Sequence, residues 1–313
     1  MNRPTMIYAL IALALTVAIR PYVTAAPQLS DWAEPTNLGC QINSPFGEQG
    51  PAISKDGLSL YFGSMRPGGF GASDIWVSQR ASVHNPWGPP LNVGAIVNTP
   101  GVENIPALSR DGHLLFFNSD RAGTSGILDI WVSYRKHVHD DFAWQRPVNL
   151  GAGVNSPALE AGASYLENEQ DDAPVLFLGR GQTLADFDIY VSELQPDGSF
   201  GSAASIPELN SAQSDQRPSV RFDGLELFFS SDRIGSLGLS DLWVSTRETM
   251  FDRWETPTNL GSTVNSSFAD MQPSIAADRQ TLFFTSNRPG GCGALDLYMT
   301  TRTRHEAPNN GEE

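Results

Sequence analysis

Residues 51–80 read PAISKDGLSLYFGSMRPGGFGASDIWVSQR, and this stretch decides the fold because the chain repeats it. Its first two apolar runs flank Asp56-Gly57, a dipeptide that strongly favours a β-hairpin turn. A third run follows a Gly-rich loop and begins with the block Asp-Ile/Leu-Trp/Tyr. Five copies of this block occur, spaced by 55, 59, 53 and 55 residues, with aspartates at Asp74, Asp129, Asp188, Asp241 and Asp296.

Two further blocks repeat in phase with the first. The second apolar run of each unit ends near an arginine, and these are Arg66, Arg121, Arg180, Arg233 and Arg288. The block W-x-x-P-x-N-[LV]-G occurs at Trp32, Trp87, Trp144 and Trp254, with a weaker copy at Phe200. Each unit therefore predicts four short strands. Five such units predict an all-β fold, a five-bladed β-propeller of four-stranded blades.

The phase of the repeat predicts how the ring closes. One copy of the W-x-x-P block, residues 32–39, precedes the first unit, while the last unit stops after its third strand near Arg302. An N-terminal strand that joins the last blade completes that blade and leaves no open sheet edge. Cys40 and Cys292 then fall on one face of this blade. We expect a disulfide between them, worth roughly 4–5 kcal/mol in the chain-entropy model; the alternative is two unpaired, partly buried thiols.

The chain is predicted to contain a signal segment, one domain and a tail. A basic start, an apolar run from Ile7 to Ile19 and small residues up to Ala26 indicate a secretory signal peptide over 1–25. The run is short for a membrane span, which needs about 20 apolar residues, so an uncleaved anchor is the less favoured alternative. The remaining bounds are 26–302 for the propeller, with blades at about 51–94, 106–151, 163–207, 218–261, and 273–302 plus 32–39, and 303–313 for a disordered tail.

Composition excludes several classes of protein. The 313 residues carry 20 Lys+Arg against 35 Asp+Glu, a formal net charge of −15 that disfavours nucleic acid and anionic membranes as partners. Only 18% of residues are charged, and 29 Gly and 22 Pro argue against a coiled coil or helical bundle. We expect an exported, monomeric protein without a membrane span after signal cleavage.

The pattern P-[AS]-[ILV]-S-x-D-G-x-x-L-[FY]-F-x-S-x-R-x-G-G-x-G-x-x-D-[IL]-[WY]-V-S-x-R resembles the WD40-like repeat of TolB-type propellers. Residues 51–80 show it almost whole, and five copies span residues 31–302. The resemblance implies an exported bacterial propeller. It implies no single activity, because this repeat occurs in binding proteins, in accessory domains of peptidases and in a few lyases.

One face of the predicted propeller gathers the candidate functional residues. The connections from the fourth strand to the next first strand, and from the second strand to the third, emerge on the same face, called here the top face. An acidic residue ends the first kind of connection in every unit. These five residues, called here the ring acids, are Glu48, Glu103, Glu160, Asp215 and Asp270. We expect them to surround the mouth of the central channel.

The ring acids have a ligand-binding and a structural interpretation. As ligand contacts, they would act with Gln49, Asn104 and Arg217, which supply amides and one cation suited to sugar hydroxyls or a peptide. As structural residues, each would bond a backbone N–H or an arginine. The aspartates of the third strands, Asp74, Asp129, Asp188, Asp241 and Asp296, are expected to be structural, paired with the arginines Arg66, Arg121, Arg180, Arg233 and Arg288 of their own units. No cofactor is expected, except possible Ca²⁺ bound by the ring acids.

The remaining clusters favour no catalytic class. His137-Val138-His139-Asp140-Asp141 lies on the opposite face and predicts a solvated loop rather than a metal site. All seven Trp fall on repeat positions, which indicates packing between blades. No G-x-S-x-G, H-E-x-x-H, P-loop or dinucleotide motif occurs, and neither Cys has an evident His partner.

Three functions fit the sequence. The favoured hypothesis is a non-enzymatic binding module whose acidic, Gly-rich top face holds a protein, cell-wall fragment or other glycan. The alternative is a carbohydrate-active enzyme, a glycoside hydrolase or lyase, with Glu103 as general acid and Glu48 or Asp270 as base. The third is a purely architectural role.

Overall fold

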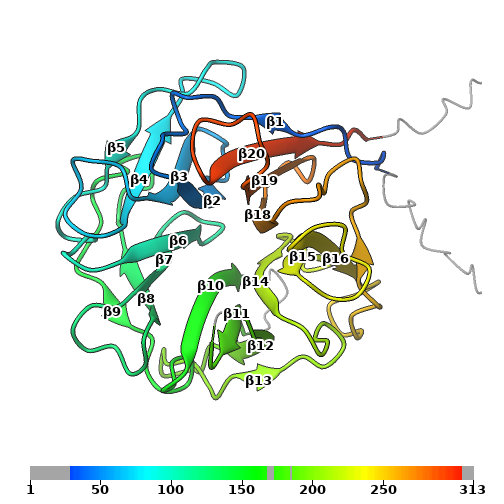
Figure 1. Cartoon of the computed structure of the whole chain (residues 1–313). Coiled ribbons are helices and arrows are strands. Elements are labelled where there is room, and N and C mark those ends of the chain that lie inside the picture. The colour runs from blue at the N-terminus through cyan, green and yellow to red at the C-terminus, as the bar shows by residue number, and fades with distance from the viewer. Residues whose placement is uncertain (1–28, 168–172, 184, 305–313) are drawn as a thin grey trace, which may run out of the picture.

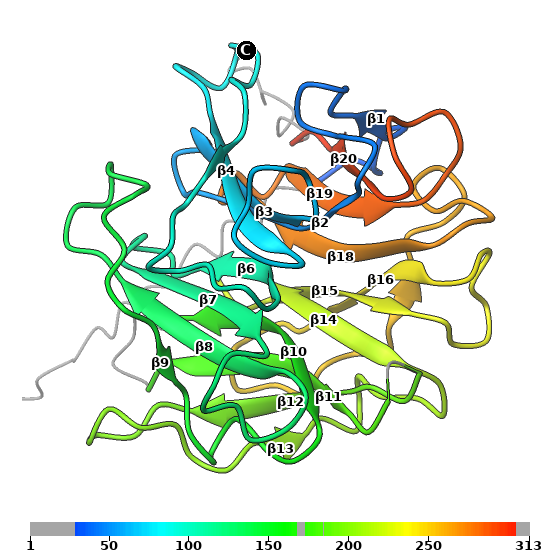
Figure 2. The same ribbon diagram turned by 60° about the vertical axis from the view of Figure 1, so that its left-hand side comes forward.

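Five four-stranded antiparallel sheets surround a central channel in the computed structural model (Figure 1). The structure describes residues 29–167, 173–183 and 185–304. Within each sheet the strands follow one another in sequence from the channel outward, apart from the closing blade. The predicted five-bladed β-propeller is therefore confirmed. Figure 2 shows the blades in a second view, turned by 60°.

The strands of each blade are short and similar in length. From the inner to the outer strand, blade 1 contains β2 (Glu48–Ile53), β3 (Ser59–Ser64), β4 (Asp74–Gln79) and β5 (Leu91–Asn92); blade 2 contains β6 (Glu103–Leu108), β7 (Leu114–Ser119), β8 (Asp129–Tyr134) and β9 (Val148–Asn149); blade 3 contains β10 (Leu159–Leu166), β11 (Val175–Gly181), β12 (Asp188–Glu193) and β13 (Ala204–Ser205). Blade 4 contains β14 (Asp215–Val220), β15 (Glu226–Ser231), β16 (Asp241–Thr246) and β17 (Thr258–Asn259); blade 5 contains β18 (Asp270–Ile275), β19 (Thr281–Ser286), β20 (Asp296–Thr301) and β1 (Thr36–Asn37). Each inner strand starts a few residues before the blade bounds expected from the sequence, because the ring acid belongs to the strand.

The hydrophobic core lies between neighbouring blades. One cluster joins Tyr61 of blade 1 to Phe117 and Trp144 of blade 2, and the rings of Tyr61 and Trp144 meet edge to face with centroids 6.1 Å apart. The arginine that follows β8, Arg135, lies over Trp144 at 4.4 Å from its ring. All seven Trp side chains are buried or half-buried. The repeated Trp positions thus serve as inter-blade packing, as the sequence predicts.

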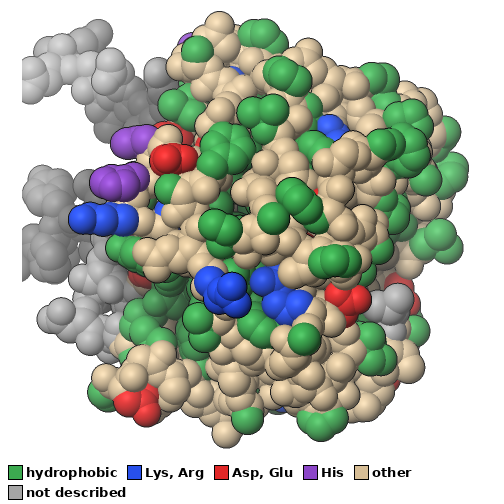
Figure 3. All heavy atoms as spheres, turned by 90° about the vertical axis from the view of Figure 1, so that its left-hand side faces the viewer, with side chains coloured by type: hydrophobic (Ala, Val, Ile, Leu, Met, Phe, Trp, Pro, Cys, Tyr) green, Lys and Arg blue, Asp and Glu red, His purple; other side chains and the backbone are tan. Residues whose placement is uncertain are grey.

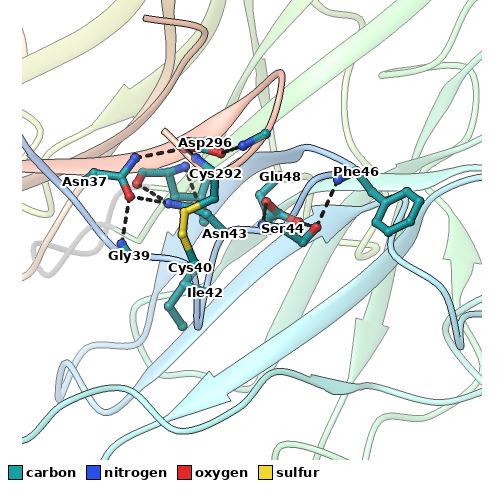
Figure 4. Close-up of a disulfide and its surroundings, with 12 residues drawn as sticks. Asn37, Gly39, Cys40, Ile42, Asn43, Ser44, Phe46, Glu48, Cys292 and Asp296 are labelled. Atoms are coloured by element: carbon teal, nitrogen blue, oxygen red, sulfur yellow. Dashed lines mark hydrogen bonds between the residues drawn. A yellow bond between two sulfur atoms is a disulfide. The ribbon is translucent and has the colours of Figure 1, made fainter. Parts of the chain in front are cut away.

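Strand β1 closes the ring as predicted. It pairs with β20, with Asn37 opposite Tyr298, so the N-terminal strand is the outer strand of blade 5. The Cys40–Cys292 disulfide links the following loop to the β19–β20 loop, with a Cα–Cα distance of 5.5 Å (Figure 4). Asn43 adds hydrogen bonds to the backbone N–H and C=O of Leu297 at 2.8 and 3.1 Å. The predicted disulfide is confirmed.

The C-terminal boundary differs slightly from the sequence-based one. Thr303 accepts a hydrogen bond from the backbone N–H of Ser30 at 2.8 Å, and Leu29 pairs with Arg304. These two C-terminal residues therefore belong to the folded part rather than to the expected tail. The rest of that tail and the expected signal segment lie outside the described residues.

No helix in the described ranges has the length and apolarity that a membrane crossing requires.

Breaking the disulfide should destabilise the ring. The bridge spans 252 residues, so removing it in a Cys40→Ser/Cys292→Ser variant should lower the free energy of unfolding by up to about 5 kcal/mol. Guanidinium denaturation of wild type and variant, each with and without reductant, measures the effect. Reductant should destabilise the wild type alone. Equal midpoints for wild type and variant would contradict a stabilising role.

Candidate functional site

The ring acids lie at the starts of the inner strands. Glu48, Glu103, Asp215 and Asp270 are the first residues of β2, β6, β14 and β18, and Glu160 is the second residue of β10. All five side chains are fully buried, with 0% of their surface exposed. They do not belong to the lining of the channel cavity. Their position at the top of the inner strands matches the sequence-based expectation, but their side chains point into the protein.

Each ring acid accepts several hydrogen bonds. Glu48 accepts from the backbone N–H and hydroxyl of Ser44 at 2.6 and 2.5 Å, and from Ser64 Oγ at 2.8 Å. It also pairs with Arg66 Nη2 at 2.9 Å. The pairs in the other blades are Arg121–Glu103 at 3.0 Å, Arg180–Glu160 at 2.8 Å, Arg233–Asp215 at 2.5 Å and Arg288–Asp270 at 2.6 Å. Neighbouring groups of the protein itself therefore use the hydrogen-bonding capacity of these carboxylates.

The arginine partners correct the sequence-based pairing. Asp74, expected to pair with Arg66, instead accepts from the backbone N–H groups of Phe70 and Gly71 and from Asn92 Nδ2 at 2.7 Å. Asp129, Asp241 and Asp296 make the same kind of contacts. The physical reason is reach: Arg66 folds back past Ser64 toward Glu48 and the carbonyl of Ile42.

Blade 3 departs from this pattern. Its outer strand β13 has Ser205 where the other blades have asparagine, so Asp188 lacks the amide donor. Burial raises the pKa of Asp188, and the negative charges of Asp215 and Asp186 raise it further. The expectation that Arg180 pairs with Asp188 is also wrong, because Arg180 binds Glu160.

Gln49 and Asn104, expected to form a polar sector, do lie close together. Gly63 of β3 separates them: a Cβ atom at Gly63 would lie 3.0 Å from Asn104 Cβ and 3.4 Å from Gln49 Cγ. Asn104 Oδ1 is buried and has no hydrogen-bond partner in the described structure. The two amides thus lie close together between blades 1 and 2. They do not form one site with the ring acids, which are already paired with other groups.

A left-handed bulge in each inner strand builds the channel wall, and the sequence analysis missed it. The pairing of β2 with β3 shifts between Gln49 and Ala52, and the other four inner strands shift at the same place. The bulge residues have positive φ and are Gly50, Ile105, Gly162, Arg217 and Gln272. All five line the channel cavity. The signal in the sequence is the proline that follows four of them, at Pro51, Pro106, Pro218 and Pro273.

The channel is narrow. Its cavity has a volume of about 60 Å³, counted as the space that the centres of water molecules can reach. This is room for a few waters. At the face opposite the top face, Arg110 of blade 2 lies 5.8 Å from the ring of Phe222 in blade 4. Since these blades are not neighbours, this contact crosses the channel. The channel offers no space for a sugar chain.

Exposed apolar side chains gather on the top face. The loops of this face carry nine of them, called here the apolar rim: Phe46, Met65, Phe70, Ile96, Ile127, Ile234, Leu237, Leu239 and Phe268. Ile234 is 90% exposed and Leu239 71%. Figure 3, a side view, shows apolar side chains along the edge opposite the histidines. Blade 3 contributes none among its described residues.

The His137–Asp141 segment is only partly the solvated loop expected from the sequence. His137, His139 and Asp140 are exposed, but Asp141 is buried and pairs with Arg135 at 2.6 Å. Asp141 also accepts from Tyr61 at 2.6 Å, and from Ser59 and Gln79 of blade 1. This residue therefore ties blade 2 to blade 1.

The described residues offer no evident metal site. No group of three or more His, Cys, Asp or Glu side chains within the described ranges is placed to hold a metal ion. The ring acids already accept bonds from serine or threonine and arginine, so calcium binding by them stays an untested prediction.

No protein-family model matches the sequence, and no curated protein sequence matches it. The fold, however, resembles solved propellers. The catalytic domain of a GH62 α-L-arabinofuranosidase from Coprinopsis cinerea has a TM-score of 0.59 at 12% identity, covering 89% of this chain and 98% of that one. A GH43_1 enzyme from Xanthomonas citri complexed with xylose has a TM-score of 0.57 at 15% identity, covering 88% and 92%.

A protein described as TolB from Agrobacterium tumefaciens matches with a TM-score of 0.49 at 15% identity, covering 90% of this chain and 100% of that one. The TolB-type resemblance is not specifically confirmed by this match and stays a prediction from the sequence. At these identities the comparisons establish the fold alone.

Removing a ring carboxylate should act on stability. In Glu103→Gln, Arg121 loses its charged partner, a carboxylate side chain with 0% of its surface exposed. The free energy of unfolding should therefore fall by about 3 kcal/mol. Urea denaturation measures it. Glu34→Gln, at an exposed acid, is the matched control and should be neutral. A stable Glu103→Gln protein would show that the pair is dispensable.

Acid should weaken the Asp141 contact between blades. Burial alone would raise the pKa of Asp141, but hydrogen bonds from Ser59, Tyr61, Arg135 and Gln79 outweigh it and hold the pKa below its usual value. A depressed pKa adds stability above the unfolded-state value of about 4, and this stability is lost as pH falls through the folded pKa.

Asp141→Asn should therefore be less stable than wild type at pH 7, with a difference that shrinks below about pH 4. Unfolding free energies measured between pH 7 and pH 2 test this. A difference that stays constant across the range would rule out the ionised Asp141 as its source.

Proposed function

We propose that this protein is a non-enzymatic binding propeller that docks a partner protein on its top face. The apolar rim is the observation that carries the proposal, since exposed apolar patches of this kind mark protein interaction sites in soluble proteins. Glycan recognition fits less well, because the rim side chains are Phe, Ile, Leu and Met, which offer sugar hydroxyls no strong hydrogen-bond partner.

The chemistry of the partner surface follows from shape and charge. The rim residues lie on top-face loops of blades 1 and 2, of blade 4, and of the connections between blades 4 and 5 and between blades 5 and 1. The chain has a formal net charge of −15. We therefore expect an apolar contact surface on the partner, bordered by basic residues that speed its approach.

The side chains of the ring acids support binding over catalysis. A general acid must reach its substrate within hydrogen-bond distance and must be able to donate a proton. Glu48, Glu103 and Asp270 are 0% exposed and paired with arginine. In this environment they stabilise the blades and are not available as an acid–base pair.

The site of action is proposed to be the periplasm or the cell exterior. The Cys40–Cys292 disulfide supports this, because such bonds persist in oxidising compartments. No helix within residues 29–167, 173–183 and 185–304 could cross a membrane, which is compatible with an exported protein.

A glycoside hydrolase is the second candidate. The solved structures similar in fold favour it over a binding module, since they include GH62 and GH43 enzymes and α-L-arabinofuranosidases. The burial of the acids argues the other way. Incubating wild type and Glu103→Gln with arabinofuranosides and xylo-oligosaccharides separates the two, provided that both are folded by near-UV circular dichroism. Turnover by wild type alone would replace the binding proposal with the enzyme.

The docking proposal predicts a face-specific effect. An Ile234→Ser/Leu239→Ser variant should bind the partner, identified by cross-linking in envelope extracts, at least about tenfold more weakly, as expected when central contacts are lost. The matched control is Phe251→Ser, since Phe251 is 79% exposed on the opposite face. Binding of purified partner by calorimetry measures both. Weakening by the control variant alone would move the interface off the top face.

A further inference from the structure

Arg217 occupies an unusual place in the channel wall. It is the third residue of β14, and its φ of 58° lies in the left-handed region that residues with a side chain seldom adopt. Pro218 follows it, and the bulge places Arg217 in the lining of the channel cavity. The sequence predicts Arg217 as a ligand-binding cation beside the ring acids. The structure places it half-buried in the channel wall, in a backbone conformation that is strained for a residue with a side chain.

The guanidinium of Arg217 has no counter-charge among the described residues. No ion pair joins it to any described residue, whereas the five blade arginines each bind a ring acid. Its Nε is buried without a hydrogen-bond partner, and its one polar contact is from Nη1 to Met271 Sδ at 3.8 Å. Burial lowers the pKa of Arg217 to about 10, so the group remains a cation at neutral pH.

An unpaired guanidinium in this position would be stabilised by a negatively charged partner. A buried charge is strongly unfavourable unless an opposite charge and hydrogen bonds compensate it. The five donor hydrogens of a guanidinium form a planar fork that fits a carboxylate through two parallel bonds. The described residues of this protein supply no such anion to Arg217.

The neighbouring residues leave room for an anion. Gln272 of blade 5 accepts from the Gly50 backbone N–H and from Thr285 through Oε1, which leaves its Nε2 donor without a partner among the described residues. The cavity of about 60 Å³ suits a group of few atoms.

We propose that the channel binds a carboxylate group, held by the Arg217 guanidinium with the Gln272 amide as a second donor. A single negative charge matches the single cation, whereas a dianion such as phosphate would bring an uncompensated charge into a protein of net charge −15. The carboxylate belongs either to a free small acid or to the chain end of a bound peptide. The inference does not depend on the apolar rim or on a docked partner.

Thermal unfolding in chloride-free buffer tests the site. Acetate at about 100 times its dissociation constant should raise the wild-type midpoint by several degrees, while acetamide, of the same shape but neutral, should not. Arg217→Gln should abolish the acetate response. Arg146→Gln, which removes an exposed arginine, is the matched control and should keep it. A tripeptide with a free C-terminus, compared with its C-terminal amide, distinguishes the source: a larger shift for the free acid identifies a chain end, and a shift with acetate alone identifies a small acid.

Several results would overturn the proposal. These are no shift with acetate or peptide in the wild type, an equal shift with acetamide, or an undiminished shift in Arg217→Gln. A chloride response that depends equally on Arg217 would assign the site to a halide. If Arg217→Gln does not fold, the comparison of acetate with acetamide on wild type decides alone. The apolar-rim variants should respond to acetate normally, so failure here is separate from failure of the docking proposal.

Discussion

The buried pair between a ring acid and its blade arginine is the interaction on which the propeller depends. In blade 1, Glu48 joins the loop before the blade, through Ser44, to the end of β3, through Ser64 and Arg66. Arg66 then reaches the carbonyl of Ile42 in the same loop. One carboxylate and one guanidinium therefore fix a loop, an inner strand and the strand beside it. Repetition of this unit in all five blades explains the regular spacing in the sequence.

The top face is built on this network, and its character follows from it. Because the arginine and acid neutralise each other below the surface, the loops above them are free to carry apolar side chains such as Ile234 and Leu239. The channel wall, in contrast, is set by the bulges, where each blade presents a different residue. Identical scaffolding thus supports an asymmetric interior, in which Arg217 is the one bulge residue that carries a charge.

The sequence predicts the topology much better than it predicts the side-chain contacts. The spacing of Asp74, Asp129 and their equivalents predicts the number of blades. The W-x-x-P block at Trp32, which precedes the first unit, predicts how the ring closes. Both predictions need only the order of residues along the chain. The partner of Arg66 does not follow from order: Asp74 is nearer to Arg66 along the chain than Glu48 is, and only the path of the side chain selects Glu48.

The site residues illustrate the same limit. The periodic acids appear to a sequence reader as a ring of available carboxylates, but burial and hydrogen bonding, which spacing cannot reveal, make them structural supports. Arg217 shows the reverse case. Its proline neighbour is visible in the sequence, while the positive φ that turns the side chain into the channel, and the absence of a counter-charge, emerge only in three dimensions.

The closure of blade 5 has a consequence for biosynthesis. The strand that completes this blade is made first, and the three strands that it joins are made last, with 252 residues between the two cysteines. During translation the first strand must wait, without its neighbour, until four other blades have emerged. The oxidised bridge can form only when both ends of the ring meet. It therefore marks each molecule that has finished folding, and a quality-control system that recognises free thiols could distinguish an open ring from a closed one.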